Sequence, residues 1–325
     1  VSGGMLIVKH NTALGGTGAV TVNNTGSLAL SNNISIGSGK SLTLLGAGFS
    51  GTVVGALANI DGNNTWVGTI TTQTNNAYIR SVSGTLTLSG NIALNITTYF
   101  GGSSNIISTG IISGAQPMFK DGTGTFTIGG AGNNTYTGAT NLTDGTLKYG
   151  SATGGSSGSA FFFSGGTLDD GGYNLSLGTL NLTANSTLNI GATQHAITFS
   201  SHTATFTAAT ILTINGWNGT SATTAITKNG QLASSSTVYV DYRGAQQSVI
   251  VGGLNQYGQI LNGLQGAGNL STQLIINNAA TNGGTASALT ATQLNQLRFI
   301  NGTTLARYYG VYKGATEIIP SAVSH

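Results

Sequence analysis

This chain has few residues of the types that act in catalysis or bind metals, and these residues are far apart in the sequence. Its 325 residues include seven acids, ten bases, four histidines and no cysteine. The only adjacent acids are Asp169 and Asp170, and consecutive side chains of a strand point to opposite faces. They therefore cannot cooperate as a catalytic pair unless a turn redirects them. We expect a solvated turn there, with a calcium site as the alternative, and no catalytic residues.

Two further patterns lack the residues that their chemistry needs. Residues 46–51 read Gly-Ala-Gly-Phe-Ser-Gly, but a dinucleotide site needs an acid about twenty positions later, and Asp61 and Asp121 are too early and too late. Among the histidines only His195 and His202 are near each other, whereas zinc takes three or four ligands. We expect a turn at the glycines, histidines at the surface, and neither metal nor cofactor.

The amino-acid composition excludes some classes of binding partner. The chain is 39% hydrophobic and only 5% charged, against about a quarter in typical proteins, so it should fold with a surface of neutral polar residues. The net charge of +3 comes from single scattered bases, so neither nucleic acid nor a membrane surface is expected as a partner. No apolar run reaches about 18 residues, so membrane insertion is not expected. Patterned sequence starts at Val1, and we interpret the chain as a processed product.

The elements that must position these residues are short strands. There are 52 glycines and two prolines, and the glycines separate short alternating runs with no helical period before about Ala288. A sandwich or a barrel is the alternative, but the charged residues that keep exposed edge strands of such folds from aggregating are almost absent. A solenoid does not need these charges, because each of its strands pairs with a strand of the next rung. We therefore expect an all-β solenoid over residues 1–216, with about 22 residues per rung.

A family resemblance lies in residues 120–150. A glycine-flanked strand is followed by Asn-Thr-Tyr-Thr-Gly at 134–138 and by a second strand that includes Gly-Thr-Leu, and residues 62–70 are similar with Trp in place of Tyr. These segments resemble the autotransporter-associated β-strand repeat, also called the passenger-associated transport repeat. The resemblance implies a right-handed parallel β-helix (β-solenoid) in a bacterial extracellular or cell-surface protein.

The C-terminal third has a different pattern. Residues 211–219, 273–278 and 289–299 resemble the tail of large repeat proteins that end in a PEP-CTERM sorting signal, and the 325 residues do not include that signal. We expect an inserted lobe at 217–272. A C-terminal capping tail should follow at 273–325.

The capping tail is expected to contain one short helix. Thr290 and Gln293 fit a capping box, and Leu289 and Leu294 fit the accompanying hydrophobic staple. These signals predict a helix from about Ala291 to Arg298. An irregular loop is the alternative.

Aromatic residues offer candidate contacts. Five tyrosines are either exposed rings for glycan binding or fillers of the rungs: Tyr78, Tyr99, Tyr136, Tyr149 and Tyr173. The inserted lobe holds a mixture of residues typical of interfaces, with an inert loop as the alternative: Tyr239, Asp241, Tyr242 and Arg243.

These features predict a non-enzymatic structural protein that self-assembles head to tail into a filament or surface layer. An uncapped first rung at Val1, Met5 and Ile7 would receive a C-terminal strand such as Arg307 to Pro320 of the next copy. The tail residues of this contact are expected to be Tyr308, Tyr309, Tyr312, Ile318 and Ile319. One alternative is a monomeric adhesin passenger that binds a glycan or host protein. The other is a polysaccharide lyase or hydrolase, which needs clustered carboxylates.

Overall fold

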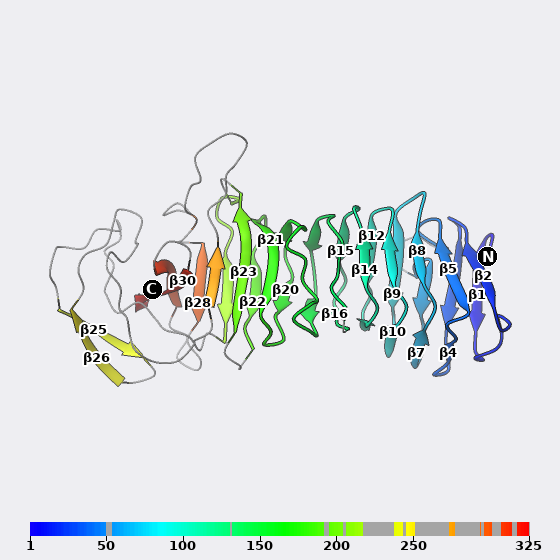
Figure 1. Ribbon diagram of the computed structural model, residues 1–325, viewed down its shortest axis with the longest axis horizontal. Helices are drawn as coiled ribbons and strands as arrows, with labels where there is room; N and C mark the ends of the chain where they lie inside the picture. Colours follow the sequence, from blue (N-terminus) through cyan, green and yellow to red (C-terminus); the bar gives the residue numbers. More distant parts are fainter. Residues whose placement is uncertain are drawn as a thin grey trace. The chain divides into compact units, whose positions relative to one another are not determined.

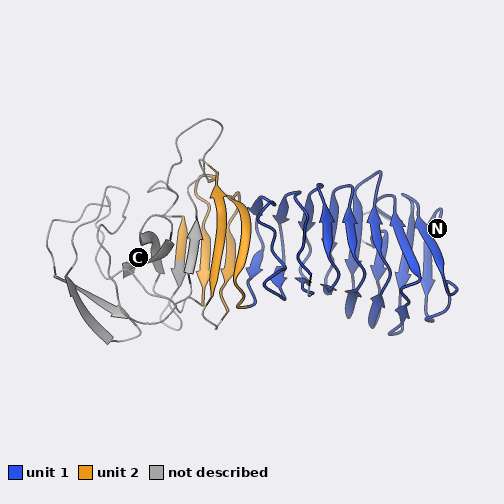
Figure 2. Cartoon of the chain, viewed as in Figure 1, with its two compact units in different colours: residues 1–171 blue, residues 172–325 orange. Residues whose placement is uncertain are grey.

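The computed structural model describes most of the first two thirds of the chain and separate segments of the rest. The described residues are 1–49, 54–130, 132–191, 195–203, 206–216, 237–242, 245–250, 273–276, 293, 296–300, 307–313 and 317–324. Apart from the helical Gln293, they form strands and turns. The chain divides into two compact units, Val1–Gly171 and Gly172–His325 (Figure 2).

Unit 1 consists of three columns of parallel strands (Figure 1). The first column contains β1 (Gly4–Val8), β3 (Gly26–Leu30), β6 (Leu57–Asn59), β9 (Ala77–Ser81), β12 (Thr98–Gly101), β15 (Met118–Lys120), β17 (Thr140–Leu142) and β19 (Phe161–Phe163). The second contains β4 (Ser35–Ile36), β7 (Asn63–Trp66), β10 (Thr85–Leu88), β13 (Asn105–Ser108), β16 (Thr125–Ile128), β18 (Thr146–Tyr149) and β20 (Thr167–Asp169). The third contains β2 (Gly18–Val22), β5 (Lys40–Leu44), β8 (Ile70–Thr72), β11 (Ile92–Leu94) and β14 (Ile112–Gly114).

The core of unit 1 follows from the alternation of side chains along each strand. Every second residue points inward, and successive rungs place these residues in register. In the first column of strands, one inward-pointing residue of each strand is aligned with the next. These residues are Leu6, Leu28, Leu57, Ile79, Phe100, Lys120, Leu142 and Phe163. All but Leu6 are buried, so the expected all-β parallel solenoid is confirmed.

Within unit 1, the rung length increases at one place. Register partners in the first column are mostly 20 to 22 residues apart, as in Thr98 with Met118 and Gly4 with Gly26. Between β3 and β6 the interval grows to 29, from Leu28 to Leu57, because more residues separate β5 from β6; the described part of this glycine-rich loop includes Gly46 to Phe49. The backbone N–H of Phe49 donates to Ser27 Oγ at 2.8 Å, so this loop lies against β3. The expected turn at these glycines is confirmed for the described residues of the segment.

Unit 2 also stacks parallel strands. β21 (Leu175–Leu182) pairs with β23 (Ala196–His202), which pairs with β27 (Gln273–Ile276). β22 (Ser186–Asn189) pairs with β24 (Leu212–Asn215), which pairs with β28 (Leu297–Ile300). β25 (Thr237–Tyr242) and β26 (Ala245–Ile250) form a separate antiparallel sheet.

The C-terminal strands pair antiparallel with the parallel strands that precede them. β29 (Arg307–Lys313) pairs antiparallel with β28, β30 (Glu317–Ser324) pairs antiparallel with β27, and the two also pair with each other. Gln296 Nε2 donates to the carbonyl oxygens of Thr207 at 2.8 Å and Thr210 at 3.0 Å, which attaches the start of this region to the preceding rung.

The expected helix over residues 291–298 is described only in part. Gln293 is helical, but β28 already begins at Leu297, so the helix ends earlier than the sequence indicates. The other residues of that helix before Gln296 lie outside the described residues.

Candidate functional site

The first rung has an apolar surface and an unpaired edge. β1 pairs with β3, and no other described strand pairs with it. Met5, Leu6 and Ile7 are 42%, 44% and 41% exposed. Leu6 is in register with Leu28, which is completely buried, so exposure of Leu6 results from its place in the outermost rung. A further strand on this edge would satisfy backbone groups of β1 and bury these side chains.

Val1 lies beside this edge and contacts other strands. Its ammonium group donates to the carbonyl oxygen of Thr21 at 2.6 Å, and its own carbonyl accepts from the Asn23 N–H at 2.9 Å. Met5 and Ile7 are therefore the exposed residues of the predicted N-terminal interface, whereas Val1 holds the start of the chain against the end of β2.

The predicted C-terminal interface residues lie in strands that already have partners within the chain. Tyr308, Tyr309 and Tyr312 belong to β29, and Ile318 and Ile319 belong to β30. β29 pairs with β28 and β30, and β30 pairs with β27 and β29, so each strand has a partner on both sides. Donation of such a strand to another molecule requires that it first leave these partners.

The predicted lobe interface is described only in its backbone. Tyr239, Asp241 and Tyr242 lie in β25, opposite Ser248, Gln246 and Ala245 of β26. Arg243 lies outside the described residues.

A second candidate site lies on the outer face of unit 1, where β9, β12 and β15 carry an aromatic ladder. Tyr78, Tyr99 and Phe119 occupy register positions of successive rungs. The ring centroids of Tyr78 and Tyr99 are 4.4 Å apart, and those of Tyr99 and Phe119 are 4.8 Å apart. Interplanar angles of 11° and 17° show that the rings stack face to face. The ring faces of the ladder therefore stack on one another, and this stacking stabilises the contact between successive rungs.

Beside the ladder lies an ion pair that spans an entire rung and joins a buried guanidinium to a partly exposed carboxylate. Arg80 and Asp121 are two rungs apart, and both guanidinium Nη atoms donate to the carboxylate, with 2.9 Å from Nη2 to Oδ2. Gly101 is the register partner of Arg80 on the rung between them. A Cβ at Gly101 would overlap both Asp121 and Nη1 of Arg80, so the pair requires a glycine at this position.

The ladder and the ion pair influence each other. The guanidinium carbon of Arg80 is 4.9 Å from the ring centroid of Tyr78, in the range of a cation–π contact. The pKa of Tyr99 is raised above its usual value of 10.0, chiefly by burial and then by the neighbouring Tyr78. Tyr99 is therefore a neutral phenol at physiological pH.

The interior holds polar groups of its own. Lys120 is 2% exposed, and its ammonium donates to three carbonyl oxygens, those of Asp121 at 2.8 Å, Gly122 at 2.7 Å and Asp144 at 3.0 Å. Burial lowers the pKa of Lys120 to about 8. Because three backbone acceptors surround it, we assign Lys120 a structural role.

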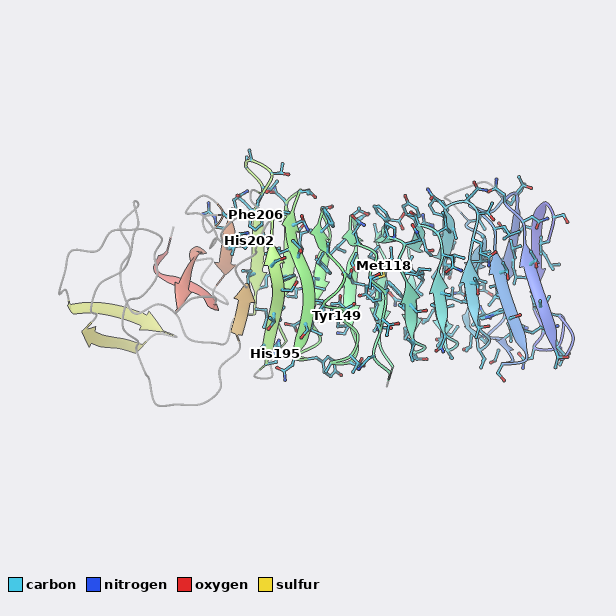
Figure 3. The ribbon with its side chains drawn as sticks, turned by 45° about the horizontal axis from the view of Figure 1, so that its top comes forward. Met118, Tyr149, His195, His202 and Phe206 are labelled. Atoms are coloured by element: carbon cyan, nitrogen blue, oxygen red, sulfur yellow. The ribbon has the colours of Figure 1, made fainter. Side chains whose placement is uncertain are left out.

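The five tyrosines fall into two groups. Tyr136 and Tyr149 are 1% and 0% exposed, and burial raises the pKa of both, which confirms their interpretation as fillers of the rungs (Figure 3 labels Tyr149). Tyr78 and Tyr99 are half-buried on the outer face, and Tyr173 is 39% exposed.

Asp169 and Asp170 point in different directions, as the alternation predicts. Asp169 accepts from Lys148 Nζ at 2.9 Å and from the Gly171 N–H at 2.9 Å, whereas Asp170 is completely buried. The expectation of a solvated turn is therefore wrong for Asp170. The inward register of the strand extends one residue beyond β20, and this takes Asp170 out of the solvent.

The expectation of surface histidines is wrong for His195 and His202. They are 6% and 2% exposed, and Nδ1 of His202 donates to the carbonyl oxygen of Thr203 at 2.8 Å. Figure 3 shows them at opposite ends of β23, too far along the strand to share a ligand. His10 is exposed, with Nδ1 3.0 Å from Thr12 Oγ1, and His325 lies outside the described residues.

The sequence does not single out Arg80, Gly101 or Asp121. Their only signal is the spacing of 41 residues between Arg80 and Asp121, which equals two rungs and is recognisable only when the register is known.

Comparisons with protein-family models, with curated proteins and with solved structures give no match. Within the described segments, no helix is long and apolar enough to span a bilayer. Nor do three or more histidine or acidic side chains gather in those segments where they could hold a metal ion.

Proposed function

We propose that this chain is a non-catalytic structural protein of the bacterial cell surface, which assembles head to tail by adding a strand from a second copy to β1. The cell-surface setting rests on the resemblance to the autotransporter-associated repeat. The assembly rests on one observation, the unpaired apolar edge of the first rung.

Three properties of β1 support the assembly. The sequence of the strand, Gly-Met-Leu-Ile-Val, has no charge or proline that would discourage pairing. Its backbone has a partner on one side, at β3. Its side chains at Met5, Leu6 and Ile7 are each more than 40% exposed, and an added strand would remove them from water.

The occupant that we propose is a C-terminal strand of the next copy. β30 supplies such a strand after exchange of its partners within the chain, as in domain swapping. A segment that precedes Val1 in a longer chain would cover the same edge, and so would a second β1. These arrangements give a monomer and a closed dimer, respectively, so the size of the assembly distinguishes them.

Sedimentation velocity over a range of concentrations tests this proposal. We expect species that grow beyond a dimer as the concentration rises. Ile7→Lys should abolish them, because a charge on the edge opposes strand addition. Val82→Lys is the matched control, because Val82 is also 41% exposed but lies away from the first rung, and it should leave assembly unchanged. A chain that stays monomeric, or stops at a dimer, would overturn head-to-tail assembly.

Two acids of unit 1 that lie in ion pairs support the non-catalytic part of the proposal. Asp121 is bound to Arg80 and Asp169 to Lys148, so each carboxylate is engaged by a cation of the fold. Release of products from an acidic polysaccharide, lost in Asp169→Asn, would contradict a non-catalytic role.

A further inference from the structure

The aromatic ladder and the ion pair of unit 1 border a pocket that the assembly does not use. Its volume is about 430 Å³, and it is a shallow hollow that is largely open to solvent. Its lining consists of Tyr78, Arg80, Tyr99, Gly102, Asp121 and Gly122. The two glycines have positive φ, 109° at Gly102 and 65° at Gly122, and place backbone instead of side chains along this wall.

The stacking within the ladder decides which part of each ring a ligand meets. Tyr99 has Tyr78 on one face and Phe119 on the other, and Tyr78 has Tyr99 on one face and the Arg80 guanidinium near its ring. A ligand therefore meets the ring edges and the phenol hydroxyls, and ring–ring stacking is not available to it. A hydroxyl both donates and accepts hydrogen bonds, so the tyrosines suit a ligand rich in hydroxyl groups.

The charges of the pocket argue against a charged ligand. Arg80 and Asp121 neutralise each other through two hydrogen bonds, so an ionic ligand would have to break a bidentate pair. The side chain of Asp121 is 26% exposed, and a carboxylate has more lone pairs than the two that Arg80 occupies. Asp121 can therefore still accept hydrogen bonds from ligand hydroxyls.

We propose that this pocket binds a neutral saccharide, held by hydrogen bonds to the hydroxyls of Tyr78 and Tyr99 and to the carboxylate of Asp121. The surface would then combine self-assembly at β1 with sugar binding along the side of unit 1. The two activities use different residues, so either can fail without the other.

Isothermal titration calorimetry of the full chain tests the proposal, with maltotetraose, cellotetraose, laminaritetraose and mannotetraose as neutral probes and trigalacturonate as the anionic probe. We expect at least one neutral probe to bind with a Kd in the millimolar range or below, and trigalacturonate to bind at least about tenfold more weakly. Tyr99→Phe removes one hydroxyl and keeps the ladder, and it should weaken binding about tenfold.

The controls separate recognition from folding and from assembly. Tyr173→Phe makes the same change at an exposed tyrosine outside the pocket and should leave the Kd unchanged. Asp121→Asn should weaken binding at least as much as Tyr99→Phe, and circular dichroism reports whether it folds. The proposal is overturned if no neutral probe binds, if trigalacturonate binds best, or if Tyr99→Phe binds as well as the unaltered chain. Sedimentation of Tyr99→Phe should match that of the unaltered chain in every case.

Discussion

Two ion pairs on the outer surface of unit 1 are built in opposite ways. Arg80 and Asp121 span two rungs, and their side chains are 5% and 26% exposed. Lys148 and Asp169 join neighbouring rungs through one hydrogen bond, and their side chains are 43% and 28% exposed. The first pair depends on a glycine between its members and on an aromatic neighbour, whereas the second depends only on register.

This difference shows how a chain with so few charges uses them. A buried pair is costly to break because the remaining charge is left in a poorly solvated site, whereas exposed pairs typically contribute about 0–1 kcal/mol. The stability of the rungs around β9, β12 and β15 should therefore depend strongly on their ion pair. The stability of the rungs around β18 and β20 should depend little on theirs. The following predictions test that contrast, from the largest expected effect to the smallest.

Asp121→Ala should have the largest effect. It removes the carboxylate from the Arg80 guanidinium, whose residue is 4% exposed, and we expect a loss of about 3–5 kcal/mol in the free energy of unfolding. Urea unfolding followed by circular dichroism measures it. A loss no greater than that of Asp169→Ala would remove the contrast between the two pairs.

Gly101→Ala should have the next largest effect. The added methyl group overlaps the carbonyl oxygen of Asp121 and the guanidinium of Arg80, so one of them must move, at a cost of about 1–3 kcal/mol. Gly158→Ala is the control, because a Cβ there would make only ordinary contacts, the nearest 3.4 Å from the methyl group of Thr137. Equal midpoints for the two variants in urea would show that the space at Gly101 is not needed.

Lys120 extends the comparison to a buried charge whose hydrogen bonds go to backbone carbonyl oxygens. Its pKa of about 8 lies below the ordinary 10.5, so the folded chain binds fewer protons than the unfolded chain between these values. The free energy of unfolding should therefore rise with pH in this window, by on the order of 1–2 kcal/mol between pH 8 and 9.5. Above about pH 10 the raised pKa values of Tyr136 and Tyr149 act in the opposite direction.

Urea unfolding of the unaltered chain and of Lys120→Met at both pH values measures this effect. Met has a similar length and no charge, so the rise should be absent in the variant. A rise of equal size in both proteins would assign it to other groups.

Lys148→Ala should have the smallest effect. Its side chain is 43% exposed, so solvent and salt screen its attraction to Asp169, and we expect a loss of about 0.5 kcal/mol that fades as salt is added. Unfolding in low and high salt checks both points. A loss above about 2 kcal/mol would mean that exposure does not separate the two pairs.

Much of the solenoid could be predicted from the sequence because alternation and glycine punctuation are local signals. They reveal strands such as β10 and β16 and, through the repeat resemblance, their parallel stacking. The site could not be predicted in the same way, because Arg80 and Asp121 meet only through the register of three rungs, and the interval between register partners in unit 1 varies from 20 to 30 residues. The sequence does not predict the burial of His202 and Asp170 for a related reason. At a bend or at the end of a strand, alternation does not tell which of the two alternating sets of side chains faces the core.

The most direct test of the assembly is hydrogen exchange, read by mass spectrometry on dilute and on concentrated protein. Among the described strands only β3 pairs with β1, so an added strand would supply partners for the β1 N–H groups that face away from β3. We predict that peptides covering residues 4–8 gain protection on assembly, while peptides from β13 do not change. Assemblies that form without added protection at β1 would contradict strand addition at the first rung.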